Sequence, residues 1–363
     1  MESAPSRISR GVSAGAATAP VCDPRAVIQG ATRSMRSRES GMSFSRRKRS
    51  IAVAATAAFA FAATACGSNG GGDKGAGPTR IKLGVIPIID IAPVQLGIEK
   101  GFFADQNLEV RTQNSQGGAA IVPGVVSGDF QFGYSNIVSL LIAKSKGVPV
   151  RMVSVGARAS GDELDDGSGQ LMANDPNIKT VADLAGKKIA VNTLRGINEV
   201  AIRSTLKKNG VSGGVALVEV PIPNMPAALH SGQVDAAMLG EPFTTVAENQ
   251  GAHPLPVNYA SMGHGLPFAA WFASEPYAAK NPQVVQRFTT ALEQSLRYAQ
   301  AHPDEARAVL NRYLKLDDGV GAKVTLPGWD PTTNRDEIET LARLAVDTGL
   351  IDNLKPLDQL MNK

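Results

Sequence analysis

The feature that most restricts the fold of this chain is a short sequence motif that occurs twice in it. Residues Val126–Asn136 read VSGDFQFGYSN, and residues His230–Phe243 read HSGQVDAAMLGEPF. Each motif has Ser-Gly at its second and third positions, which is typical of the end of a helix. A short mixed apolar segment follows and predicts a strand, which should end at the next polar residue. We therefore expect a fold in which one structural unit occurs twice.

The first copy alternates strand and helix patterns from residue 81 onward. Asp90 and Pro93 are residues that begin a helix, and Gly101 is one that ends it. The expected order is a strand over 81–88, a helix to about residue 100, a strand over 108–114, a helix over 117–128 and a strand over 129–135.

The second copy repeats this order. It predicts strands over 187–193, 215–222 and 233–241, with helices over 199–209 and 226–230 between them. Two tandem β-α-β-α-β units predict an α/β protein of two lobes, each a mostly parallel sheet flanked by helices. Chance similarity between two α/β units is the alternative, but five elements in the same order argue against it. At 363 residues, the chain is long enough for both lobes.

The N-terminal region reads as a targeting segment. The basic run Arg46–Arg49 precedes the apolar run Ile51–Ala65 and then Cys66, which is the pattern of a secretory signal peptide. A transmembrane helix would require roughly 20 apolar residues. Ala63–Cys66 resembles the lipobox of bacterial lipoproteins, in which the cysteine carries the lipid. An ordinary signal peptide with an incidental cysteine is the alternative.

These patterns divide the N-terminal region into three parts. We expect residues 1–41 to be a non-native upstream extension, because Met42 lies just before the basic run where a signal peptide normally starts. Residues 42–66 are the expected lipoprotein signal peptide with its attachment site at Cys66. Residues 67–78, rich in glycine, are the expected flexible tether. The protein should then be exported and anchored by lipid to the outer face of the cytoplasmic membrane.

The basic character of the chain belongs to this leader. Ten of the 37 Lys and Arg and three of the 33 Asp and Glu precede residue 67, so the remainder holds 27 basic and 30 acidic residues. This balance argues against a nucleic-acid partner. The only cysteines are Cys22 and Cys66. The folded part therefore offers no disulfide, thiol nucleophile or cysteine metal site.

From Ile81 to about Ile351 the chain resembles the substrate-binding proteins of bacterial ABC importers. The likeness is carried by VIPIIDIAPVQLGIEKGFFADQNLEV, SGDFQFGYSN, KTVADLAGKKIAV, SGQVDAAMLGEPF and LPGWDP. The most similar group binds nitrate, sulfonate, taurine and thiamine-pyrimidine precursors, and has the type II periplasmic-binding-protein fold. The resemblance implies a small-molecule ligand in a cleft between two lobes, an ABC permease as partner, a monomer, and no cofactor, metal or catalytic residue.

The resemblance also implies that the chain crosses between the lobes twice, at hinges about which they close. We place these crossings near Leu171–Ala173 and Phe268–Ser274. The expected lobe one then comprises residues 79–172 and 269–363, and the expected lobe two comprises residues 173–268.

Ligand contacts are expected at strand ends and helix starts, because small molecules bind beyond the carboxyl ends of parallel strands. In lobe one these positions are Asp90, Gly117, Gly118, Tyr134, Ser135 and Asn136. In lobe two they are Asn192, Thr193, Arg195, Gly196 and Glu241. His264, near the second crossing, completes the set.

Several of these residues have a structural alternative. Asp90 either faces the ligand or caps a helix. Gly117 and Gly118 offer N–H groups to an oxygen or simply form a turn. Arg195 either binds a sulfonate or carboxylate or lies exposed. Glu241, as a buried carboxylate, needs either a ligand N–H or a structural partner. The aromatic residues stack on a heterocycle or pack in the core, and are Tyr134, Phe243, Phe268 and Trp271.

The two carboxylates favour a particular ligand. If Asp90 and Glu241 face the cleft, an aminosulfonate or a pyrimidine-like heterocycle fits better than bare nitrate. Two other functions remain open. One is an enzyme of the thiamine-pyrimidine synthase type, which uses an active-site histidine and a cysteine-rich iron motif. This chain has no cysteine after Cys66 and therefore lacks the iron motif. The other is a ligand-sensing module for a membrane partner.

Overall fold

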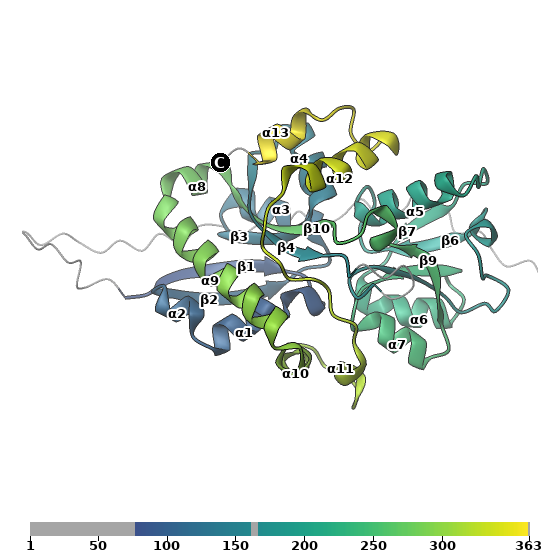
Figure 1. Cartoon of the computed structure of the whole chain (residues 1–363), viewed down its shortest axis with the longest axis horizontal. Coiled ribbons are helices and arrows are strands. Elements are labelled where there is room, and N and C mark those ends of the chain that lie inside the picture. The colour runs from purple at the N-terminus through teal and green to yellow at the C-terminus, as the bar shows by residue number, and fades with distance from the viewer. Residues whose placement is uncertain (1–76, 161–165, 362–363) are drawn as a thin grey trace, which may run out of the picture. The chain divides into compact units, whose positions relative to one another are not determined.

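The computed structural model describes residues 77–160 and 166–361, all within one compact unit, Gly71–Lys363 (Figure 1). The expected upstream extension, the signal peptide with Cys66 and nearly all of the tether lie outside the described residues. In the part of the chain that is described, no helix has the length and apolar character needed to cross a membrane.

The first sheet contains the first copy of the repeat. Its strands run in the order β2-β1-β3-β10-β4. All are parallel except β10, which is antiparallel to both of its neighbours. The strands are β1 (Thr79–Val85), β2 (Leu108–Asn114), β3 (Phe132–Asn136), β4 (Val150–Arg158) and β10 (Pro267–Ser274).

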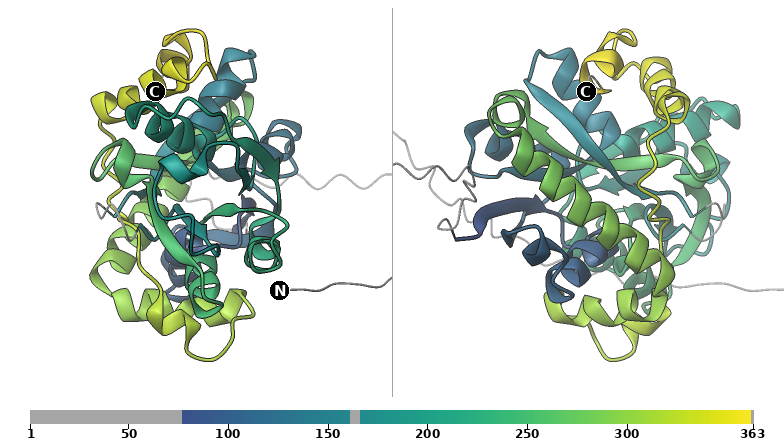
Figure 2. Two further views of the ribbon diagram at one scale, coloured as in Figure 1. Left: turned by 90° about the vertical axis from the view of Figure 1, so that its right-hand side faces the viewer. Right: turned by 60° about the vertical axis from the view of Figure 1, so that its left-hand side comes forward.

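The helices of the first copy follow its strands. A 3₁₀ turn (Ile89–Ile91) leads into α1 (Ala92–Glu99), and after it come α2 (Phe102–Asp105), α3 (Gly118–Ser127) and α4 (Ile137–Ser145). C-terminal helices also pack on this lobe (Figure 2). They are α8 (Glu275–Lys280), α9 (Pro282–Ala301), α10 (Pro303–Tyr313), α12 (Arg335–Asp347) and α13 (Lys355–Met361).

The second sheet contains the second copy, in the order β7-β6-β8-β5-β9. Here β5 is the single antiparallel strand. The strands are β5 (Gln170–Ala173), β6 (Lys188–Val191), β7 (Ala216–Glu219), β8 (Ala236–Leu239) and β9 (His253–Asn258). The helices are α5 (Ile197–Lys208), α6 (Met225–His230) and α7 (Phe243–Asn249). The two mostly parallel sheets expected from the sequence are therefore present.

The repeat extends to single hydrogen bonds. The glycines that follow α3 and α6, Gly128 and Gly232, both have left-handed backbone, with φ of 89° and 70°. The N–H of Lys82 in β1 donates to the side chain of Gln131 over 2.8 Å. At the equivalent place, the N–H of Lys188 donates to Asp235 over 2.7 Å. In both lobes the repeated motif therefore forms the end of a helix, a glycine turn and the start of a strand.

The crossings between the sheets lie before the positions expected from the sequence. The chain leaves the first sheet after Arg158 and returns to it after Asn258. As far as the structure describes them, the first passage is therefore residues 159–160 and 166–169, and the second is residues 259–266. The expected crossings at 171–173 and 268–274 are wrong, because these residues form β5 and β10. The expected boundaries at 172–173 and 268–269 fall inside these strands. Both strands are buried along their length, which explains their continuous apolar sequences.

A third connection, which the sequence did not indicate, runs from α11 (Val320–Lys323) to α12. We call its residues 324–334 the strap, and Figures 1 and 2 show it crossing the face of the molecule. The N–H of Thr325 in the strap donates to Glu241 beyond β8 over 3.2 Å. Gly328 exchanges two backbone hydrogen bonds with Arg158, at 2.8 and 3.0 Å. The strap thus contacts both lobes.

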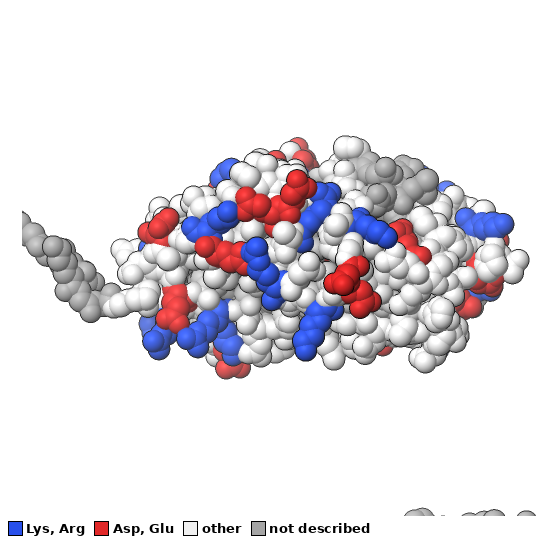
Figure 3. Space-filling view, turned by 90° about the horizontal axis from the view of Figure 1, so that it is seen from below, with Lys and Arg blue, Asp and Glu red and all other residues white. Residues whose placement is uncertain are grey.

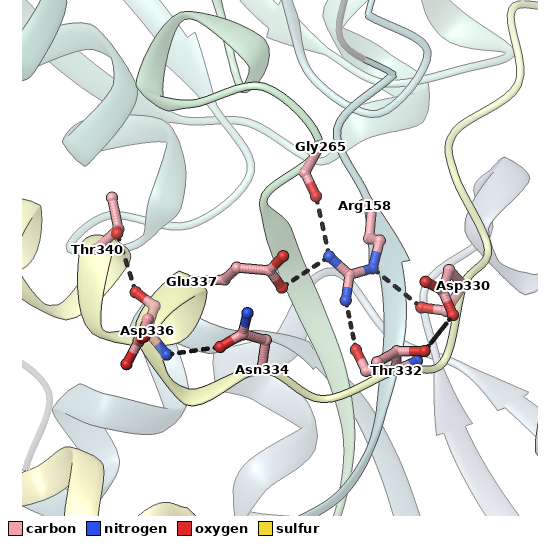
Figure 4. A network of polar contacts seen from close by, with 8 residues as sticks. All are labelled: Arg158, Gly265, Asp330, Thr332, Asn334, Asp336, Glu337 and Thr340. Atoms are coloured by element: carbon pink, nitrogen blue, oxygen red, sulfur yellow. Dashed lines mark hydrogen bonds and ion pairs between the residues drawn. The ribbon is translucent and has the colours of Figure 1, made fainter.

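Arg158 fastens the strap to the crossings (Figure 4). Its guanidinium donates to the carbonyl oxygens of Asp330, Thr332 and Gly265. It also pairs with Glu337 of α12 over 2.9 Å. Because Arg158 ends β4 and Gly265 lies in the second passage, one buried side chain connects both crossings to the C-terminal segment.

Charged side chains are mixed on the face shown in Figure 3, where Lys and Arg alternate with Asp and Glu.

The core of the first lobe is aromatic, and the rings of Phe132 and Phe288 stack 3.8 Å apart. Trp271 of β10 is fully buried beside them. Trp271 is therefore a core residue, which is one of the two roles that the sequence left open for it.

Candidate functional site

The candidate site is a cavity of about 40 Å³ between the two sheets. A water molecule needs about 10–15 Å³ on this measure, so the cavity suits a small ligand. Residues at or just after the carboxyl ends of four parallel strands line it: Ile86 after β1, Asn136 in β3, Asn192 after β6 and Gly240 after β8. This is the edge at which parallel α/β sheets bind ligands.

Asp90 is the acidic group of the cavity lining, and it comes from lobe one. Its side chain is almost fully buried, and Oδ2 accepts a hydrogen bond of 2.8 Å from the hydroxyl of Tyr134. Oδ1 is buried and has no hydrogen-bond partner. Burial raises the pKa of Asp90 to about 7, against the smaller opposite effect of the Tyr134 hydrogen bond. Its expected alternative role as a helix cap is wrong, because Asp90 lies within the 3₁₀ turn and makes no capping bond.

Lobe two contributes a connected set of polar groups. The hydroxyl of Tyr259 donates to Oδ1 of Asn198 over 2.5 Å, and Nδ2 of Asn198 donates to Oδ1 of Asn192 over 3.0 Å. Ser168, in the first passage, lines the same cavity, and its buried hydroxyl has no partner. These side chains face Asp90, Tyr134 and Asn136 across the cavity.

The glycines expected at the rims bring the two lobes close together. A Cβ atom built on Gly117 would lie 2.4 Å from Oγ1 of Thr193 and 3.1 Å from Nδ2 of Asn192. A Cβ on Gly196 would lie 3.4 Å from Oγ of Ser139 and 3.8 Å from Nδ2 of Asn136. Residues predicted from separate halves of the sequence therefore meet across the gap.

Four of the twelve predicted residues line the cavity: Asp90, Tyr134, Asn136 and Asn192. Asn136 also caps α4, because its Oδ1 accepts from the N–H of Ser139 over 2.8 Å. Ligand contact by these four residues stays a prediction. Gly117, Thr193 and Gly196 lie at the rim, where they contact the opposite lobe.

The remaining predicted residues lie outside the cavity lining. Ser135 is fully buried and faces Gly118, where a Cβ would lie 2.0 Å from Oγ of Ser135. This orientation follows from the alternation of side chains along β3, since Tyr134 and Asn136 face the cavity. Arg195 is exposed, and its guanidinium donates to the carbonyl oxygen of Leu350 over 3.0 Å. His264 is exposed in the second passage.

Glu241 is buried, as expected, but its partners belong to the protein. Its carboxylate accepts from the N–H and hydroxyl of Thr245, at 3.1 and 2.8 Å, and from the N–H of Thr325. Burial raises its pKa to about 7, partly offset by these hydrogen bonds. Of the two roles that the sequence left open for Glu241, this geometry favours the structural one.

Sequence reasoning missed three polar residues of the cavity: Ser168, Asn198 and Tyr259. Asn198 follows the predicted loop 192–196 by two residues, so a wider search around that strand end would have found it. Ser168 and Tyr259 lie in the two passages, where no strand or helix pattern marks them. Among the aromatic candidates, Tyr134 and Phe268 line the cavity and Phe243 packs against the core.

Comparisons with known proteins agree with this architecture. A family model described as NMT1/THI5 like matches residues 88–306. The taurine-binding periplasmic protein of Escherichia coli is 24% identical over 204 residues, which are 56% of this chain and 61% of that protein. The nitrate/nitrite binding protein NrtA of Synechococcus elongatus is 26% identical over 291 residues, covering 69% of this chain and 66% of NrtA. The chain thus spans less than two thirds of the length of these relatives.

A solved structure confirms the fold. The alkanesulfonate-binding protein SsuA of Xanthomonas axonopodis pv. citri superposes with a TM-score of 0.66 at 16% identity, covering 79% of this chain and 99% of SsuA. The expected two-lobed periplasmic-binding-protein fold is therefore correct. Since the family model matches more than half of its residues, the chain belongs to the NMT1/THI5-like family.

Proposed function

We propose that this protein binds a small polar solute between its two lobes and delivers it to an ABC importer. The observation that carries the proposal is the cavity between the sheets, where Asp90 and Ser168 each present a buried polar atom without a partner. Buried polar groups of this kind cost free energy unless a ligand or water satisfies them. The relatives named as taurine-binding and nitrate/nitrite binding proteins support the same class of function.

The proposed mechanism is closure of the lobes around the ligand. Only the closed arrangement lets both lobes contact one small molecule, so the ligand shifts the population toward it. Arg158, the strap and the two passages form the region about which the lobes would move. The permease would then recognise the closed form. No covalent chemistry is needed for this cycle.

Export, the lipid anchor at Cys66 and a monomeric state belong to the same proposal. The apolar run before Cys66 and the periplasmic relative from Escherichia coli support export. Radiolabelled fatty acid incorporated into the wild-type chain but not into a Cys66→Ala variant would support lipid attachment, and equal labelling of the two chains would contradict it.

The binding function is tested by calorimetry and thermal shift on the full-length chain. The compounds are aminosulfonates, sulfonates, nitrate, aromatic acids and pyrimidines. We expect at least one class to bind saturably at one site per chain and to raise the melting temperature by mass action. If no class does so, the protein does not have the proposed function. If a bound compound is chemically converted, the protein is an enzyme instead.

A further inference from the structure

We propose that the cavity selects ligands that carry a protonated amine or a comparable N–H donor, and that Oδ1 of Asp90 accepts this donor. The inference rests on the proposed binding function and names its ligand class. Asp90 is the one carboxylate that lines the cavity in the described part of the chain.

Asp90 is held in place for this role. The Tyr134 hydroxyl donates to Oδ2, which leaves Oδ1 as the free acceptor of a nearly fully buried side chain. A buried carboxylate oxygen without a donor is costly. A ligand ammonium or amidine N–H would satisfy it with a charge-assisted hydrogen bond.

The tyrosines around the cavity add acceptors and not donors. The hydroxyl proton of Tyr134 is used by Asp90, and that of Tyr259 is used by Asn198. Each phenol oxygen therefore has only lone pairs to offer to a ligand. The side chains on both sides of the gap thus favour a ligand that donates.

Groups that would bind an anion are few here. No Lys or Arg lines the cavity among residues 77–160 and 166–361. Arg195, the basic residue of the loop between β6 and α5, donates instead to the carbonyl oxygen of Leu350. The side-chain donors left for a ligand are neutral. They are the Ser168 hydroxyl, Nδ2 of Asn192, whose Oδ1 is used by Asn198, and Nδ2 of Asn136, whose Oδ1 is used by Ser139. These suit an acceptor atom on the same ligand but do not neutralise a charge.

The experiment compares two ligands that differ in the amine. Taurine and ethanesulfonate share the sulfonate and the two-carbon chain, and only taurine carries an ammonium group. Nitrate and 4-aminopyrimidine extend the pair to a simple anion and a neutral N–H donor. Titration calorimetry on the full-length chain should give saturable binding of taurine or 4-aminopyrimidine and at least about tenfold weaker binding of ethanesulfonate and nitrate.

The variant Asp90→Asn keeps the size of the side chain and turns the free acceptor into a donor. We expect it to weaken binding of the amine by about 100-fold or more and to leave or improve binding of the anions. Glu241→Gln is the matched control, because Glu241 is a second buried carboxylate that is bound by Thr245 and Thr325 outside the cavity. Its effect on the affinities should be much smaller than that of Asp90→Asn, and it should not change the preference for amines over anions.

A measurement on the unmodified protein covers the case in which Asp90→Asn fails to fold. The titratable groups that face Asp90 are Tyr134 on β3, Asp166 in the first passage, Tyr259 after β9 and Tyr313 on α10. None is a Lys, Arg or His that could stabilise the ionised form of Asp90, so an amine ligand should drive Asp90 to its carboxylate. Binding at about pH 6.5 should then release protons, detected as a heat that depends on the buffer, whereas an anion would take protons up.

The outcomes separate this inference from the proposed function. Binding of taurine or 4-aminopyrimidine with proton release, lost in Asp90→Asn, supports both. Tight binding of ethanesulfonate or nitrate, with no preference for the amines and no effect of Asp90→Asn, overturns the ligand class and leaves the binding function standing. Failure of every compound to bind overturns both.

Discussion

Gly117 of lobe one and Thr193 of lobe two lie opposite each other across the gap between the lobes. A Cβ atom at Gly117 would lie 2.4 Å from Oγ1 of Thr193, although one residue follows β2 and the other follows β6. Gly117 has extended backbone, with φ of −175°, so any residue can adopt its conformation. The close approach of the lobes, and not the backbone conformation, therefore favours glycine here.

Gly117→Ala should weaken ligand binding without destabilising the unliganded protein. Its methyl group would hold the lobes apart, and overpacking of this kind costs about 1–3 kcal/mol, so affinity should fall by about 5- to 150-fold. Calorimetry and thermal melts without ligand measure the two effects. Adding Thr193→Ala to the same chain should restore part of the affinity. Wild-type affinity in Gly117→Ala would show that the lobes do not close onto this contact.

Gly118→Ala should have the opposite pattern. A Cβ at Gly118 would lie 2.0 Å from Oγ and 2.7 Å from Cα of Ser135, and both residues belong to lobe one. Rotation of the serine cannot relieve a clash with its backbone, so α3 must shift on β3. We expect a loss of about 1–3 kcal/mol in the free energy of unfolding, measured by chemical denaturation. A variant as stable as the wild type would contradict this packing.

The unliganded protein should lose stability as pH rises from about 4 to about 7. Burial raises the pKa of Asp90 from 3.8 and that of Glu241 from 4.5, in both cases to about 7. Over this interval the folded chain holds protons that the unfolded chain has released, so the free energy of unfolding falls with pH. Each unit of a raised pKa corresponds to about 1.4 kcal/mol.

The variants Asp90→Asn and Glu241→Gln separate the two contributions. Each should flatten part of the decline in melting temperature, measured by differential scanning fluorimetry without ligand between about pH 4.5 and 7.5. A profile with the wild-type slope in both variants would mean that neither carboxyl group retains its proton on folding.

Arg158→Met should loosen the strap and destabilise the fold. The change keeps an apolar stem but removes the bonds to Asp330, Thr332, Gly265 and Glu337. Loss of one partner from a buried charge network costs about 3 kcal/mol or more. Arg80→Met is the control, because Arg80 pairs with Glu109 at the surface with 81% of its side chain exposed. It should change stability by less than about 1 kcal/mol. Equal effects of the two changes in denaturant melts would contradict the role of Arg158.

The sequence was sufficient for the order of the elements because their signals are local. The 129–135 and 233–241 patterns became β3 and β8, and Gly128 and Gly232 took the left-handed backbone that ends the preceding helix. Strand 108–114 was predicted with the bounds that the structure has. Hydrophobic period and glycine placement act within one turn or one strand, so a single copy of the pattern is enough to specify them.

Such local signals could not predict where the chain crosses between the two lobes. Residues 171–173 and 268–273 are apolar because they lie in central antiparallel strands that each arrive from the opposite lobe. A buried strand and a buried crossing have the same composition, and only pairing with distant strands distinguishes them.

By itself the sequence determined that this protein has two α/β units and that polar residues gather at their strand ends. Only the tertiary structure decided which of those residues share a cavity. Tyr134 and Asn136 face it while Ser135 between them does not, because a strand turns successive side chains to opposite faces. Ser168 and Tyr259 joined them from the passages, since their position depends on how the two lobes meet and not on any pattern within either one.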